Sequence, residues 1–156
     1  MKLVLLSIET SKQGWFESVS DLYSGKISHY LPFEFKRLKS KDRSRDAQDR
    51  KIEEEGRLIL DNLETSDFVI LCDEKGTACD SKAFAKKMIS AVESGKKRLV
   101  FVIGGAYGVA DEIKARANWT WSLAPMTLNH FIAQTVAMEQ IFRALTIWRG
   151  VPYHNE

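Results

Sequence analysis

No stretch of the sequence is apolar over the roughly 20 residues that a membrane-spanning helix needs, so we expect no membrane partner. The apolar start, residues 1–6, is followed by Glu9 and Lys12, which indicates a first strand rather than a signal peptide. Cysteine is scarce: the spacing of Cys72 and Cys79 matches neither a CxxC redox pair nor a zinc site. We therefore expect no metal and a cytoplasmic protein with two free thiols, with a single disulfide as the alternative.

Two nucleotide-binding patterns are also missing. A dinucleotide-binding fold carries GxGxxG directly after its first strand, but residues 7–11 at that place contain no glycine. A Walker lysine loop is absent as well. These absences disfavour a nucleotide-dependent oxidoreductase and an ATP-binding protein. The sequence also lacks internal repeats and linkers, and 44% of it is hydrophobic, so we expect one domain over residues 1–156.

The hydrophobic pattern predicts strands alternating with helices. Apolar runs such as 67–72 and 98–103 are typical of parallel strands buried on both faces. Their alternation with helices indicates an α/β fold with a mostly parallel sheet and helices on both faces. A turn is expected at 73–76, and Ser81 is the expected cap of a helix that ends at Gly95. The other predicted strands are 2–8, 32–38 and 119–123, and the other predicted helices are 14–23, 47–63, 110–117 and 130–148.

Positive charge is concentrated in one segment, although the net charge of the whole chain is only +2. Residues 36–51 have a net charge of +5 and few apolar side chains, so they belong on a loop or an exposed helix face. A basic loop of this kind neutralises the phosphates of a nucleic acid. A solvated loop with internal salt bridges explains the segment equally well.

The last predicted helix, 130–148, is apolar nearly all round. Plotted at 100° per residue, Phe131, Ala137 and Ile132 point in three different directions. A helix of this kind must be covered on more than one face. We expect the second cover to be another subunit, which makes a homodimer through this helix; a central helix enclosed within one monomer is the alternative.

Three loops of the C-terminal half each follow a predicted strand, at 71–76, 104–108 and 123–128. In an open parallel sheet, ligands bind outside the carboxyl ends of the strands. Glycines in the second loop let a ligand approach the backbone, although a structural turn explains them as well. The pattern favours a cofactor bound by backbone loops near the C-terminal half.

Several segments together resemble the small SPOUT methyltransferases that methylate N3 of a pseudouridine in 23S ribosomal RNA. Length and segment order match along essentially the whole chain. The resemblance implies an S-adenosylmethionine-dependent homodimer that acts on 23S ribosomal RNA in the assembled ribosome. It also implies a deep trefoil knot in the C-terminal part, whose three loops hold the cofactor. The segments are FVILCDEKG (68–76), FVIGGAYG (101–108), WSLAPMTLNH (121–130), MEQIFRA (138–144) and RGVPYH (149–154).

The resemblance also assigns the cofactor-binding residues. Backbone groups and apolar side chains would hold the cofactor, and the adenine ring would lie against residues 123–128. Asn129 stands where proline is common in that family, and Gln134 stands where an arginine is frequent. The assigned residues are Cys72, Gly104, Gly105, Leu123, Ala124, Pro125, Met126, Thr127 and Leu128.

Methyl transfer to a ring nitrogen is helped by a base or by a positive charge near the developing anion. In the family resembled, Tyr153 and His154 would form a tail that caps the active site across the dimer. His130, His154 and Asp73 are candidate proton acceptors, and Arg143 is a candidate stabiliser of the anion. Each has a simpler alternative: a histidine bonded to backbone, a frayed terminus, a turn residue, and an arginine paired only within its own helix.

Two other functions share part of this pattern. A non-catalytic RNA-binding α/β protein would keep the basic segment but would need no cofactor pocket. A SPOUT methyltransferase that acts on another RNA, such as tRNA, would share the loops. The terminal Tyr153 and His154 and the short N-terminus argue against the second alternative, through the resemblance alone.

Overall fold

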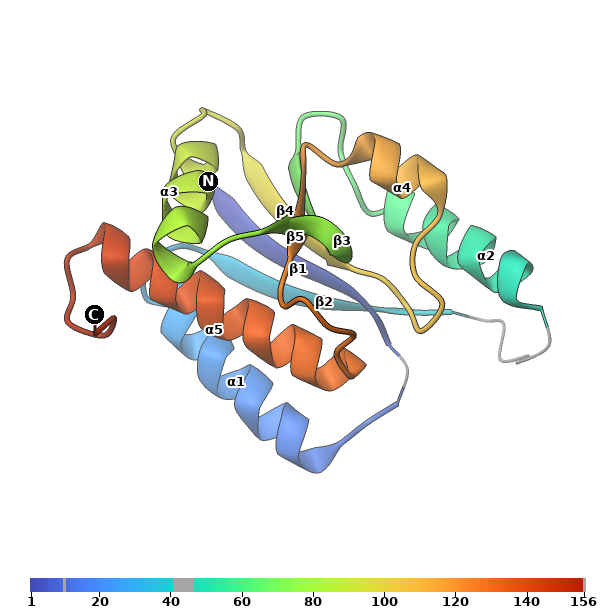
Figure 1. The fold of residues 1–156 in the computed structure, drawn as a ribbon, viewed down its shortest axis with the longest axis horizontal. Helices are drawn as coiled ribbons and strands as arrows, with labels where there is room; N and C mark the ends of the chain where they lie inside the picture. The colour runs from blue at the N-terminus through green and yellow to red at the C-terminus, as the bar shows by residue number, and fades with distance from the viewer. Residues whose placement is uncertain (10, 41–46, 156) are drawn as a thin grey trace.

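A computed structural model of the chain describes residues 1–9, 11–40 and 47–155. It contains a five-stranded parallel sheet in the order β2-β1-β4-β3-β5. Helices alternate with the strands and cover both faces (Figure 1), which confirms the predicted fold class. None of the described helices is both long and apolar enough to cross a membrane. The elements are β1 (Lys2–Glu9), α1 (Gly14–Ser28), β2 (Phe33–Lys39), α2 (Gln48–Leu60), β3 (Phe68–Ala78), α3 (Ser81–Val92), β4 (Arg98–Ile103), α4 (Asp111–Arg116), β5 (Trp119–Ser122) and α5 (His130–Trp148).

The two faces of the sheet bury alternate side chains of the same strand. In β1, Leu3 and Leu5 belong to the core shared with α1, α3 and α5, whereas Val4 and Leu6 belong to the core shared with α2 and α4. Side chains alternate in direction along a strand, so a strand covered on both faces is a continuous apolar run. All four are at most 3% exposed. Ligands can therefore reach this part of the sheet only at the ends of its strands.

Strand β3 differs from its prediction. It continues beyond Cys72, and both Cys72 and Thr77 pair with Trp121 of β5. Residues 73–76 leave the ladder as a bulge within one strand rather than as a turn between two elements. Gly76 is required there because a Cβ atom would lie 2.7 Å from the backbone of β5. The prediction was wrong because the residues after Cys72 are mostly polar, which conceals the second stretch of pairing.

Helix boundaries differ from the predictions where packing or capping decides them. Helix α1 continues beyond the predicted 14–23 because Ile27, near its end, is fully buried in the core. Helix α3 is capped by Asp80 and not by Ser81, since the Asp80 carboxylate accepts a hydrogen bond of 2.7 Å from the amide of Ala83. The two candidate caps are adjacent in sequence, and only the backbone conformation separates them.

Helix α5 has the predicted bounds and runs antiparallel to the strands (Figure 1). The side chain of Asn129 caps it by accepting a hydrogen bond of 3.0 Å from an amide of its first turn. His130 contacts the carbonyl of Ile8 at the carboxyl end of β1. Further along, the Phe142 ring lies 6.1 Å from the ring of Tyr30, just before β2 begins. The helix therefore begins at the carboxyl end of the sheet and finishes at the amino end.

Candidate functional site

The three predicted loop segments lie side by side at one end of the sheet, the first as the bulge within β3 and the other two as loops after β4 and β5. Cys72 of β3 is in register with Ile103 of β4 and with Trp121 of β5. Because the strands are parallel, the segments that follow these residues meet at one end of the sheet. A hydrogen bond of 2.7 Å from Thr127 Oγ1 to Glu74 Oε2 ties the third segment to the first. The residues gathered there, named the loop cluster below, are Cys72, Gly104, Gly105, Leu123, Ala124, Pro125, Met126, Thr127 and Leu128.

The loop after β4 has no room for side chains at its first two glycines. A Cβ atom at Gly104 would lie under 3.0 Å from the side chain of Val109, and one at Gly105 under 3.0 Å from the carboxylate of Glu55. Gly108 has a φ of +88°, a conformation that L side chains rarely adopt. Packing thus accounts for the glycines, and close approach of a ligand to the same backbone stays a prediction.

The loop after β5 exposes an apolar side chain. Met126 is 63% exposed at the tip of this loop. Behind it, Leu123 packs against the core, and Ser122 Oγ donates a hydrogen bond of 2.9 Å to the carbonyl of Ala124. A flat apolar ring such as adenine would cover Met126 and find backbone groups beside it, so this loop fits the predicted contact.

Both cysteines are poor nucleophiles in this structure. Burial, with a smaller contribution from Asp73, raises the pKa of Cys72 to about 12. Burial and Asp80 raise the pKa of Cys79 as well. Both are free thiols, as predicted. Because the Cys72 thiol stays protonated at neutral pH, its contribution to the loop cluster is packing and backbone geometry.

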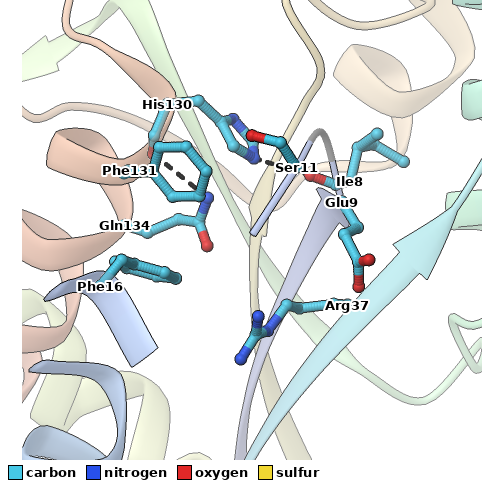
Figure 2. Close-up of a pocket in the computed structure, with 8 residues that line it drawn as sticks. All are labelled: Ile8, Glu9, Ser11, Phe16, Arg37, His130, Phe131 and Gln134. Atoms are coloured by element: carbon cyan, nitrogen blue, oxygen red, sulfur yellow. Dashed lines mark hydrogen bonds between the residues drawn. The ribbon is translucent and has the colours of Figure 1, made fainter. Parts of the chain in front are cut away.

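His130 joins the start of α5 to the end of β1. Its Nε2 lies 2.6 Å from the carbonyl oxygen of Ile8 and 3.2 Å from Ser7 Oγ, and Figure 2 shows the ring reaching toward β1. Burial lowers the pKa of His130, and the hydrogen bond to Ile8 opposes this effect. A neutral ring that donates from Nε2 satisfies the carbonyl of Ile8. This geometry favours the backbone-bonded alternative, and a catalytic role for His130 stays a prediction.

Two polar side chains of the tail bond to two polar side chains in the second half of α5. Arg143 donates to Glu139 Oε1 from Nη2 at 2.6 Å and from Nε at 3.0 Å. Tyr153 donates its hydroxyl to the same oxygen at 3.1 Å, and Arg143 Nη1 lies 3.1 Å from His154 Nδ1. The guanidinium also lies over the Tyr153 ring, 4.7 Å from its centroid. Glu139, Arg143, Tyr153 and His154 are named the tail cluster below. The terminus is therefore held at His154, and Arg143 does more than pair with Glu139.

The charge of Arg143 determines where the protons of the tail cluster lie. A guanidinium only donates hydrogen bonds, so Nδ1 of His154 is the acceptor and the neutral ring carries its hydrogen on Nε2. Burial, together with hydrogen bonds to Glu139 and Tyr23, raises the pKa of Tyr153 to about 12. The hydrogen bond to Glu139 raises the pKa of Arg143. The tail cluster thus contains a guanidinium that is paired with Glu139 and a histidine ring whose Nε2 can donate a hydrogen bond.

The loop cluster and the tail cluster lie at opposite ends of α5. Arg143 follows His130 by thirteen residues, which is about 20 Å at 1.5 Å per residue. The Tyr153 ring packs 4.8 Å from Phe142, so the tail stays at the far end of the helix. Figure 1 shows the C-terminus beside the end of α5, away from the turn that leads into its start. One chain alone therefore keeps apart the residues that were predicted to form one active site.

Part of the predicted basic segment, residues 41–46, lies outside the described residues. Arg37, before it, donates two hydrogen bonds to Glu17 at 2.5 and 2.6 Å. Lys39 lies 3.7 Å from the carboxylate of Glu9. These two residues fit the salt-bridged alternative, and contact between the segment and RNA stays a prediction.

Sequence reasoning missed Glu55 and assigned Glu139 no role in the site. Glu55 is 3% exposed although the charged residues around it predict an exposed helix face. One signal was available: a glycine inside a helix often marks a close contact. A Cβ atom at Gly56 would lie 2.7 Å from that of Ala110, so α2 at this point packs tightly against the chain that follows the β4 loop.

Comparison with protein families gives one match that covers almost the whole chain. A family described as predicted SPOUT methyltransferases matches residues 1–154. A curated protein of Bdellovibrio bacteriovorus, named Ribosomal RNA large subunit methyltransferase H, is 45% identical over 155 residues, which are 99% of each chain. Proteins of the same name from Christiangramia forsetii and Parabacteroides distasonis are 35% and 36% identical, over at least 99% of each chain.

Solved structures share the fold at low sequence identity. A probable methylase family protein from Haemophilus influenzae superposes with a TM-score of 0.55 at 15% identity, over 99% of this chain and 70% of that one. The SpoU methyltransferase AviRb from Streptomyces viridochromogenes, solved in complex with the cofactor AdoMet, superposes with a TM-score of 0.50 at 14% identity. That match covers 95% of this chain and 60% of AviRb. These likenesses concern the fold.

Proposed function

The chain belongs to the SPOUT methyltransferase family, and on that premise we propose that it transfers a methyl group from S-adenosylmethionine to 23S ribosomal RNA. The acceptor is N3 of a pseudouridine, as in the family that the sequence resembles. The curated relatives, named as methyltransferases of large-subunit ribosomal RNA, support the substrate class. The observation that carries the proposal is the register at Cys72, which sets three loops side by side at one end of the sheet.

The loop cluster fits the cofactor. Met126 offers an exposed apolar surface to an adenine ring, and Gly104 and Gly105 add no side chains of their own to the neighbouring loop. S-adenosylmethionine supplies a methyl group that its sulfonium already activates, so the protein contributes mainly position. We expect the C-terminal part to form the deep trefoil knot of this family, with these loops as the loops of the knot.

When the ring nitrogen of the acceptor base loses its proton, the negative charge that develops on the base needs stabilisation. The tail cluster offers the means: Arg143 is positively charged, and His154 keeps a hydrogen on Nε2 that it can donate. Glu139 orients the guanidinium through two hydrogen bonds, and Tyr153 packs beneath it. In this arrangement the tail cluster acts as an anion stabiliser rather than as the proton acceptor.

The separation of the two clusters requires a second subunit. A twofold axis perpendicular to α5 would reverse the helix of the partner and bring its tail cluster to the loop cluster of the first chain. Apolar side chains on α1 and α5 are available for such an interface: Trp15 is 47% exposed and Ile132 is 42% exposed. The Trp15 ring packs edge-on against Phe131 at 6.1 Å, so both helices contribute to one surface. The active unit is thus a homodimer with two composite sites.

A subunit of this size offers little surface for reading a long nucleotide sequence. It therefore recognises the shape of its target in the assembled ribosome, in the cytoplasm. Mass spectrometry of 23S ribosomal RNA from a strain lacking this gene tests the proposal. The expected result is loss of one methyl group from a pseudouridine, restored by the wild-type gene. An unchanged methylation pattern in ribosomal RNA, with loss of a methyl group from tRNA, would assign the enzyme to another RNA.

A further inference from the structure

Helix α2 carries a buried carboxylate that the fold leaves without a hydrogen bond on one oxygen. Glu55 is 3% exposed, and its Oε2 has no hydrogen-bond partner among the residues that the structure describes. Asp67, the other buried acidic residue among those described, also has an oxygen without a hydrogen bond, but this Oδ1 lies 3.2 Å from Arg98 Nε, and its Oδ2 accepts a hydrogen bond from the amide of Glu64. Within the described core, Glu55 is thus the acidic side chain that lacks a close cation.

This carboxylate lies against the second loop of the loop cluster. Its Oε2 occupies the space that a Cβ atom of Gly105 would need. Lys51, one helical turn earlier, lies 5.6 Å from the ring centroid of Tyr107 in the same loop. Its positive charge lowers the pKa of Glu55. Burial has the larger effect and raises the pKa of Glu55. Helix α2 therefore supports the 104–108 loop with an acidic group that is only partly compensated.

Folding alone does not account for such a group. A buried carboxylate with an unsatisfied oxygen destabilises the fold, and an apolar side chain of the same size would pack there without that penalty. A ligand that brings a positive charge and N–H donors to this point would satisfy the oxygen. S-adenosylmethionine carries two positive charges, on its sulfonium and on its α-ammonium, and only the ammonium has hydrogens to donate.

We propose that Glu55 receives the α-ammonium group of S-adenosylmethionine beside the backbone of Gly105. The inference rests on the proposed function, because it takes the cofactor from there. It adds a side-chain contact to a site otherwise built from backbone and apolar surface. The two charges are of opposite sign and the acceptor is already dehydrated, so the contact contributes directly to affinity.

Isothermal titration with three ligands tests the contact separately from catalysis. S-adenosylmethionine and S-adenosylhomocysteine both carry the α-ammonium, whereas methylthioadenosine lacks the amino-acid part. Glu55→Gln is expected to weaken binding of the first two by about tenfold to hundredfold, the range for a hydrogen bond to a charged group. Binding of methylthioadenosine is expected to stay the same.

Glu53→Gln is the matched control, because Glu53 is exposed on the same helix and pairs with Arg57. It should leave all three affinities unchanged. If Glu55→Gln melts early, Glu55→Met replaces it, since an apolar side chain of similar size suits the buried site. Equal affinities for wild type and variant, or an equal loss for all three ligands, would overturn the contact. Failure of the wild-type protein to bind S-adenosylmethionine would instead overturn the proposed function.

Discussion

The loop cluster and the tail cluster differ in what they are made of. The loop cluster contains two glycines, mostly small or apolar side chains, and a methionine that is 63% exposed. The tail cluster consists of polar side chains in contact, with Arg143 bonded to Glu139 and to His154. In the proposed function, the loop cluster would bind the cofactor and the tail cluster would act on the acceptor base. The two tasks can therefore fail independently.

Removing residues 150–156 tests the tail cluster alone. The deletion takes away Tyr153 and His154 and leaves the loop cluster intact, so methyl transfer should fall by about a thousandfold or more. Affinity for S-adenosylmethionine should stay within about twofold. Single-turnover transfer to ribosomes measures the first quantity, and titration measures the second. Gel filtration checks that the dimer persists, and full transfer without the tail would remove it from the mechanism.

Gly104→Val tests the loop cluster alone. The added side chain competes with Val109 for space and fills the place where a ligand would approach the backbone, so affinity for S-adenosylmethionine should fall by about a hundredfold. Titration measures the loss, and the melting temperature shows whether the fold is kept.

A second pair of variants separates ligand space from packing at the same position. Val109→Ala relieves the clash that a Cβ atom at position 104 creates. If Gly104→Ala with Val109→Ala still binds weakly, the methyl group blocks the ligand. Full recovery of affinity in the double variant would show that only packing was disturbed.

Mixing the two inactive proteins tests whether the clusters meet across subunits. Random exchange places half of the chains in heterodimers, and each heterodimer has one complete composite site, so activity should return to about a quarter of wild type. The intact site combines the loops of the tail-deleted chain with the tail of the Gly104→Val chain. A mixture as inactive as its components would place both clusters of a working site in one chain.

The smallest expected effect concerns stability. Burial raises the pKa of Glu55. Between the usual glutamate pKa and this raised value, the folded chain therefore holds a proton that the unfolded chain has released. Wild-type stability should therefore fall as pH rises from the usual glutamate pKa of about 4.3 to the raised value. Glu55→Gln should be more stable than wild type at neutral pH by about 1 kcal/mol and equal to it near pH 4. Urea denaturation at the two pH values measures the difference, and a less stable variant at neutral pH would contradict the unsatisfied carboxylate.

The sequence predicted most of the fold because burial on both faces leaves a clear pattern. The runs 67–72 and 98–103 could be recognised as parallel strands, and the bounds of α5 were predicted correctly. The second part of β3 could not be found, because its pairing partner lies in β5 and its residues are mostly polar. Pairing between segments distant in sequence leaves no local period to detect.

The candidate site was predicted in part. The three segments were predicted from the rule that ligands bind at the carboxyl ends of parallel strands, and the register at Cys72 brings them to one end of the sheet. The individual residues of the loop cluster came from the family resemblance, and their contact with a cofactor stays a prediction. The distance between Arg143 and the loops follows from the predicted bounds of α5, whereas the contacts of the tail with Glu139 and Arg143 are tertiary and leave no local pattern in the sequence. Glu55 stayed hidden because its neighbours in α2 are charged, and burial of one position among them depends on tertiary contact with Gly105.

Because α5 runs antiparallel to the strands, its length sets how far the tail lies from the loops. Inserting or deleting one residue between His130 and Arg143 would shift the tail by about 1.5 Å and rotate it by about 100°. A twofold dimer would repeat that error at both catalytic centres at once. The number of residues between His130 and Arg143 therefore sets the position of the tail relative to the loops.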